Sequence, residues 1–168
     1  MKALGIFIGI AVALALQTTL ARFMVGGTTA VDFVLVAVVY VALTSGPVAG
    51  MLSGTVAGLI QDALSTGVIG IGGLAKSIVG FLAGAIGQQF IVTAAFPRLV
   101  MFVAATLVHA ALFMGLYVAL GLRMFPSPWK AVAVQSLGNA IVGIVAFGII
   151  ESVPGALERR RAGRRGRR

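Results

Sequence analysis

The chain has 168 residues, of which 60% are apolar and 10% are charged, and its mean hydropathy is +1.09. Soluble domains carry about 25% charged residues, so this composition excludes a soluble protein and predicts that most of the chain lies in a membrane. The formal net charge is +9, and the absence of cysteine excludes a disulfide framework and thiolate metal sites.

Residues 3–21 form the first candidate span, an uncharged run of 19 residues between two cations. That length is enough to cross roughly 30 Å of hydrocarbon. A signal peptide is the alternative, because a cation precedes the run and residues 13–15 (Ala-Leu-Ala) resemble a small-residue cleavage site. Residues 22–32 predict a loop that contains Gly26 and Gly27. Asp32 is expected at the start of the second helix, where its charge favours the positive end of the helix dipole.

Residues 33–61 contain no charge, but one helix of this length is too long for a bilayer without a steep tilt. Gly46-Pro47 marks the expected break, because proline disfavours a helical conformation in the preceding residue and is well placed in the first turn of a new helix. The third helix is expected to run to about Ser65. The glycine-rich residues 65–73 then predict a loop or a broken segment at the membrane edge.

Three more helices are expected, over residues 74–91, 96–120 and 131–150. The sequence therefore predicts an all-α, polytopic membrane protein with six transmembrane helices in a single domain, residues 1–154. Residues 155–168 carry seven arginines and are expected to form a disordered basic tail along anionic lipid. A nucleic-acid partner is not expected, because a membrane anchor explains the arginine run.

Orientation follows from the cations that flank the six predicted helices. An even number of helices puts both termini on one side, together with Lys2, Arg98 and the seven tail arginines, which are nine cations in all. Arg22, Arg123 and Lys130 lie on the other side. The positive-inside rule therefore places both termini in the cytoplasm. Five helices would instead separate Lys2 from the tail.

Glycines recur every four residues in the third helix and again in the fourth. In an apolar helix this spacing exposes a strip of backbone that another helix or a partner can approach closely. The fourth helix is the expected neighbour, and a span of another protein is the alternative. The residues of this glycine ridge are Gly46, Gly50, Gly54, Gly58, Gly80 and Gly84.

Asp62, Ser65 and Lys76 form a candidate polar pocket at the outer end of the third and fourth helices. A charge at the centre of a span costs about 2.5–3.5 kcal/mol on insertion scales, so the acid and the cation are expected to pair. The alternative is a salt bridge at the interface, with Lys76 extending to the headgroups.

The other intramembrane polar residues predict helix packing rather than chemistry. His109 stands alone in the fifth helix and cannot build a metal site, so a hydrogen bond between helices is expected. Gln135 and Asn139 lie on one face of the sixth helix, where amides commonly join helices in lipid. No Walker loop, nucleophile elbow or metal motif occurs, so no catalytic residue, metal or cofactor is expected.

The central third of the chain resembles the MreD family of rod shape-determining proteins, which are small membrane proteins of bacteria. The resemblance rests on Gly46-Pro47, on the segment Gly58–Asp62 with Ser65 and Gly67 after it, and on Ala75-Lys76. Length, helix number and a charged C-terminal end agree over the rest.

The resemblance implies a non-enzymatic component of the cell-elongation machinery in the bacterial cytoplasmic membrane. Its implied partner is the single-span scaffold MreC. Through MreC the protein would support the wall synthase made of RodA and a class B penicillin-binding protein, in concert with MreB filaments.

The family is also similar in fold to the substrate-binding subunits of energy-coupling-factor vitamin transporters, which supplies an alternative function. Such a subunit would bind a vitamin in the outward pocket, and its first helix would present small residues to a coupling subunit. Gly5, Gly9 and Ala13 have the required four-residue spacing.

Overall fold

The computed structural model describes residues 2–20, 24–25, 28–65, 67–90, 92 and 94–165, and for residues 2, 24–25, 28–29 and 153–165 only the backbone. The described chain is all-α, as the sequence predicts, apart from a two-residue antiparallel ribbon in which Met24 pairs with Thr29. The expected loop residues Arg22, Gly26 and Gly27 lie outside the described residues. The elements are α1 (Lys2–Leu20), β1 (Met24–Val25), β2 (Thr28–Thr29), α2 (Phe33–Ser45), α3 (Pro47–Leu64), α4 (Ile71–Gln89), α5 (Ala95–Ala119) and α6 (Trp129–Arg165).

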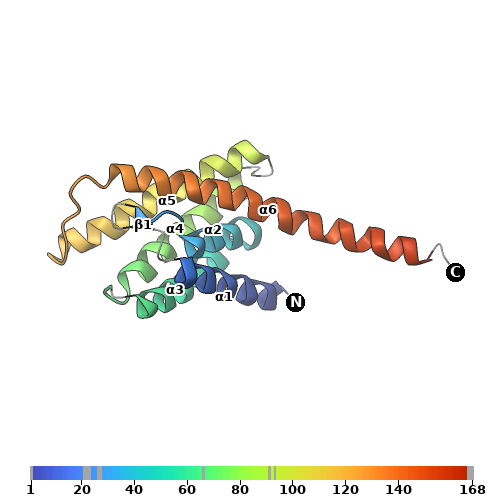
Figure 1. Cartoon of the computed structure of the whole chain (residues 1–168), viewed down its shortest axis with the longest axis horizontal. Coiled ribbons are helices and arrows are strands. Elements are labelled where there is room, and N and C mark those ends of the chain that lie inside the picture. The colour runs from blue at the N-terminus through green and yellow to red at the C-terminus, as the bar shows by residue number, and fades with distance from the viewer. Residues whose placement is uncertain are drawn as a thin grey trace.

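Within the described residues, four helices contain a segment that is long and apolar enough to cross a membrane: Ala3–Leu20, Ile71–Gln89, Ala95–Ala119 and Trp129–Ser152. The apolar α2 has only 13 residues. Figure 1 shows both termini at the same end of the bundle, and the α3–α4 and α5–α6 connections at the opposite end. The all-α fold with several long apolar helices is typical of a polytopic membrane protein, and the start of α1 and the end of α6 lie at the same end of the bundle.

The short helix α2 forms the centre of the bundle and contacts all five other helices. Val34, Val38 and Val39 on this helix are completely buried. A helix that is apolar on every side is stable only when other elements surround it. The main core gathers Leu35 and Val39 of α2 with Phe102 of α5 and residues of α4 and α6.

The glycine ridge brings the backbones of α3 and α4 into contact, as its spacing predicts. A Cβ added at Gly58 would lie 2.6 Å from Gly73 Cα, and one at Gly84 would lie 2.5 Å from Pro47 Cα. Gly50 and Gly80 face each other's backbone in the same way. Only glycine leaves room for this approach, so α4 fills the ridge.

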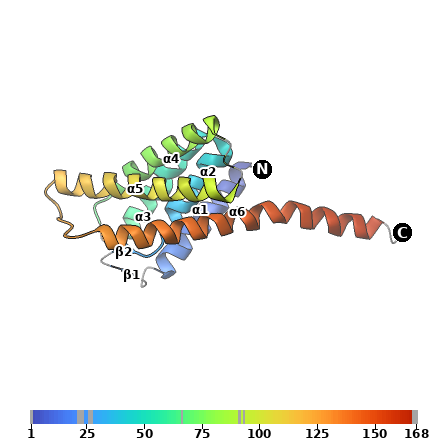
Figure 2. The same cartoon turned by 90° about the horizontal axis from the view of Figure 1, so that it is seen from above.

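The start of α4 and the end of α6 differ from the sequence prediction by three residues or more. Helix α4 begins at Ile71 rather than near residue 74, because Gly70 makes the turn with a left-handed φ of 107°. Helix α6 continues past Ile150 through Pro154 to Arg165 and runs beyond the bundle, as Figure 2 shows. Residues 155–165, for which the sequence predicts a disordered tail, continue this helix in the structure; five of these eleven residues are arginines, which favour helix.

Candidate functional site

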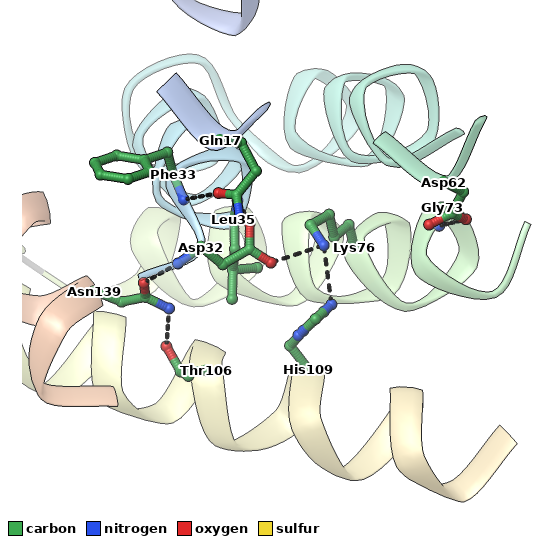
Figure 3. Close-up of polar contacts among 10 residues, drawn as sticks. All are labelled: Gln17, Asp32, Phe33, Leu35, Asp62, Gly73, Lys76, Thr106, His109 and Asn139. Atoms are coloured by element: carbon green, nitrogen blue, oxygen red, sulfur yellow. Dashed lines mark hydrogen bonds and ion pairs between the residues drawn. The ribbon is translucent and has the colours of Figure 1, made fainter. Parts of the chain in front are cut away.

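Asp32 connects the start of α2 to two other helices (Figure 3). Its Oδ1 accepts a hydrogen bond from the N–H of Leu35 at 2.9 Å, which caps α2 as the sequence predicts. Its Oδ2 lies 2.9 Å from the Lys76 ammonium of α4. Its backbone N–H donates to Oδ1 of Asn139 on α6 at 2.8 Å. One residue thus fixes the position of α2 relative to α4 and α6.

Lys76 completes a buried ion pair between α2 and α4 and extends it to α5. Its side chain is only 4% exposed, and that of Asp32 is 5% exposed. The Lys76 Nζ also lies 3.2 Å from Nε2 of His109, which is the hydrogen bond between helices expected of that histidine. Burial removes the solvation of both charges, so the pair is stable only while each charge keeps its partners.

Asp62 is not the partner of Lys76, so the predicted ion pair between them is wrong. Asp62 Oδ2 instead accepts a hydrogen bond from the N–H of Gly70 at 2.9 Å and another from the N–H of Gly73 at 3.1 Å. Figure 3 shows Asp62 beside Gly73 and away from Lys76. The first N–H groups of a helix have no partner within it, and they carry the positive end of its dipole. The Asp62 carboxylate therefore pairs with the free N–H groups and the positive dipole end at the start of α4. Lys76 forms its ion pair with Asp32 instead.

Asp32, Lys76 and His109 form a buried polar group, called here the Asp32 cluster, and amide side chains join the remaining helices to it. Asn139 donates through Nδ2 to Thr106 Oγ1 of α5 at 3.0 Å, in agreement with its expected role. On α1, Gln17 accepts through Oε1 from the N–H of Phe33 at 2.8 Å. The start of α2 is thus connected by hydrogen bonds or ion pairs to α1, α4 and α6, and through Lys76 and Asn139 to α5.

A cavity of about 470 Å³ lies beside this cluster, at the end of the bundle formed by the α3–α4 and α5–α6 connections. The three predicted pocket residues, Asp62, Ser65 and Lys76, all line it. The sequence reasoning missed the contributions of Asp32 and of α5. The signal on α5 was the four-residue spacing of His109, Phe113 and Tyr117, which places three rings on one face. Further lining residues are Asp32, Gln61, His109, Phe113, Tyr117, Arg123, Phe125 and Gln135.

A second cavity, of about 680 Å³, is an apolar groove between α1, α2 and α6. Gly5 and Gly9 line it, and a Cβ added at either glycine would meet no atom within 4 Å. This groove differs from the glycine ridge of α3 because no helix of the described chain fills it.

At the end of the bundle away from the α5–α6 connection, a buried arginine joins α5 to α6. Arg98 donates to Glu151 through Nη1 at 3.0 Å and Nη2 at 2.5 Å, and its guanidinium lies 4.2 Å from the centre of the Phe147 ring. Such a two-point contact fixes orientation as well as distance. Among the residues that the structure describes, no group of three histidine, cysteine or acidic side chains could hold a metal ion.

Residues 2–150 match the family of the rod shape-determining protein MreD. The chain belongs to the MreD family. The matched region contains the Asp32 cluster, the glycine ridge and both cavities, and it ends within α6 at Ile150. Comparison with curated proteins finds no significant match, and comparison with solved structures finds none either. Membership of the family assigns the chain a role in rod shape determination.

Proposed function

We propose that this MreD-family chain is a non-enzymatic component of the bacterial cell-elongation complex in the cytoplasmic membrane. It binds the single-span scaffold MreC and thereby supports lateral peptidoglycan synthesis by RodA and a class B penicillin-binding protein, with MreB filaments as an indirect partner. The observation that carries the proposal is the family match over residues 2–150.

The groove between α1, α2 and α6 supports the assignment of a transmembrane helix as the partner. Gly5 and Gly9 present bare backbone at four-residue spacing on an apolar surface. Membrane helices associate through small residues that allow close contact. The ridge on α3 already contacts α4, so α1 is the surface that can receive the span of MreC.

The proposed orientation places both termini in the cytoplasm, where the arginine tail meets anionic lipid. It is supported by the nine cations on that side and by the position of both termini at one end of the bundle (Figure 1). Reporter fusions after Arg168 should read cytoplasmic, and fusions near Thr28 should read periplasmic. A periplasmic C-terminus would contradict the six-span arrangement.

Co-purification tests the function. The tagged chain, isolated from its own cells in mild detergent, should carry a single-span scaffold protein, identified by mass spectrometry. Small molecules in the same eluate should be analysed alongside. A tightly bound vitamin without any scaffold protein would contradict the proposal and assign the chain to a transporter.

The variant Gly9→Leu tests whether α1 is the surface that contacts MreC. The added side chain should separate the partner helix from α1 and lower the yield of co-purified MreC about tenfold, which corresponds to about 1.4 kcal/mol of binding free energy. Gly115→Leu on α5 is the matched control, because Gly115 is an exposed helical glycine that also has no neighbour within 4 Å. Equal yields from the two variants would exclude α1 as the contact.

A further inference from the structure

The groove between α1, α2 and α6 is mostly apolar, and its polar lining residues are Tyr40, Thr44 and Ser45 of α2. Ser45 is the last residue of α2, and Thr44 comes just before it. The Thr44 hydroxyl already has a partner, because its Oγ1 donates to the backbone oxygen of Tyr40 at 2.8 Å. Tyr40 is therefore the polar side chain of the groove that lies farthest from the end of the helix.

The Tyr40 hydroxyl forms no hydrogen bond with the residues that the structure describes. Its ring is packed, because the ring centres of Tyr40 and Phe147 on α6 are 4.5 Å apart. Arg98 also contacts the Phe147 ring, but its guanidinium donates to Glu151. The packed ring thus holds a hydroxyl that remains available to a molecule in the groove.

Two contacts between α2 and α6 give the level of Tyr40 in the bundle. The residue numbers differ by 107 both in the hydrogen bond from Asp32 to Asn139 and in the ring contact of Tyr40 with Phe147. The two helices therefore run parallel in constant register, and Tyr40 lies at the level of Phe147. Phe147 precedes the end of the apolar segment, Ser152, by five residues, or about 8 Å.

The antiparallel helix α1 gives a similar depth. Its Gln17 accepts from the N–H of Phe33, so eight residues back along α1 and eight forward along α2 bring Gly9 beside Val41. Gly9 lies seven residues from the start of α1, or about 10 Å. Since the hydrocarbon core is about 30 Å thick, Tyr40 and Gly9 lie within it at one level.

The unpaired hydroxyl distinguishes the two kinds of molecule that can fill a groove in a membrane. A lipid acyl chain has no hydrogen-bonding atom, so it would leave the Tyr40 hydroxyl unpaired in hydrocarbon, which costs free energy. A transmembrane helix can carry a hydroxyl or amide side chain, and such side chains form hydrogen bonds between membrane helices. The groove therefore favours a helix with a polar side chain at the depth of Tyr40.

We propose that the MreC span carries a hydroxyl or amide side chain that hydrogen-bonds to Tyr40, in the same turn as the residue that contacts Gly9. This inference rests on the proposed function, because it describes the partner of the same groove. The glycines allow close approach but do not select one position along the groove. A shift of the partner by one helical turn, about 5.4 Å, would break the hydrogen bond, so Tyr40 sets the register.

The variant Tyr40→Phe removes only the hydroxyl and keeps the ring that contacts Phe147. It should lower the yield of co-purified MreC about fivefold, as expected for the loss of one hydrogen bond between membrane helices. The unfolding midpoint of the chain produced without MreC should not change, because the hydroxyl has no partner within the described chain. Thr44→Val is the matched control: it removes a hydroxyl of the same groove that is bonded within α2, and it should keep the wild-type yield.

The outcomes separate this inference from the proposed function. Equal MreC yields from Tyr40→Phe and the wild type would overturn the inference and leave the proposed function intact. A wild-type chain that retains no MreC would overturn both. A lower unfolding midpoint of Tyr40→Phe in the absence of MreC would show that the hydroxyl bonds within the chain, which also contradicts the inference.

Disulfide cross-linking locates the partner residue. The chain has no cysteine, so Tyr40→Cys provides a single thiol in the groove. Single cysteines are placed in turn along the MreC span, and the strongest cross-link should fall at a serine, threonine, asparagine or glutamine position. A strongest cross-link within a turn that contains only apolar residues would overturn the inference.

Discussion

The glycines of α3 and those of α1 have the same spacing but opposite surroundings. Gly50, Gly54 and Gly58 touch the backbone of α4, whereas Gly5 and Gly9 have no atom within 4 Å of an added Cβ. Four-residue spacing permits close approach but does not say which helix approaches. The short connection from α3 to α4 supplies a neighbour for the α3 ridge, whereas the glycines of α1 stay open in the apolar groove.

Gly54→Leu should have the largest effect. A Cβ at this position would lie 2.6 Å from the carbonyl carbon of Lys76, so the two backbones must separate. The change should destabilise by more than about 5 kcal/mol, above the usual overpacking cost of about 1–3 kcal/mol, because backbone atoms cannot move aside as side chains do. Denaturation in mixed detergent measures it. A Gly54→Leu protein that unfolds like the wild type would show that the ridge contact adds nothing.

Asp32→Asn should come next, because it leaves the Lys76 ammonium buried without its counter-charge. Breaking one side of a buried pair costs about 3–5 kcal/mol, and replacing both partners costs less. The double variant Asp32→Asn, Lys76→Met should therefore be more stable than either single variant. Strictly additive losses in this double-mutant cycle would show that the two residues are not coupled.

Asp62→Asn should cost less, about 1–2 kcal/mol, because the amide oxygen can still accept from Gly70 and Gly73 while the favourable charge at the start of α4 is lost. In combination with Lys76→Met its effect should add to within about 0.5 kcal/mol, since the hydrogen bonds and ion pairs of the two residues go to different partners. Strong coupling between Asp62 and Lys76 in this cycle would instead support the ion pair between them that the sequence predicts.

Gly9→Leu should have the smallest effect on stability. The new side chain enters open space in the apolar groove, and leucine is a better helix former than glycine by up to about 1 kcal/mol. The unfolding midpoint should stay equal to that of the wild type or rise slightly. A marked loss of stability would mean that α1 packs more closely than its exposed glycines indicate.

Several features of the fold followed from the sequence because they depend on local chemistry. The apolar composition required a membrane, and Gly46-Pro47 separates α2 from α3 because a proline at the first helical position ends one helix and begins another. Asp32 caps α2, and the glycine ridge contacts α4. Asp62, Ser65 and Lys76, which the sequence places in one polar pocket, line one cavity of the structure, because all three lie toward the same end of the α3–α4 hairpin.

Only the tertiary structure decided which acid pairs with Lys76. The lysine side chain is long and can reach an acid on either neighbouring helix, so sequence proximity favoured Asp62. Because α4 begins at Ile71, its free N–H groups meet Asp62, and Lys76 lies deeper in the bundle beside the start of α2. Hydropathy and spacing determine where helices form, whereas the partners of a buried charge depend on how those helices are assembled.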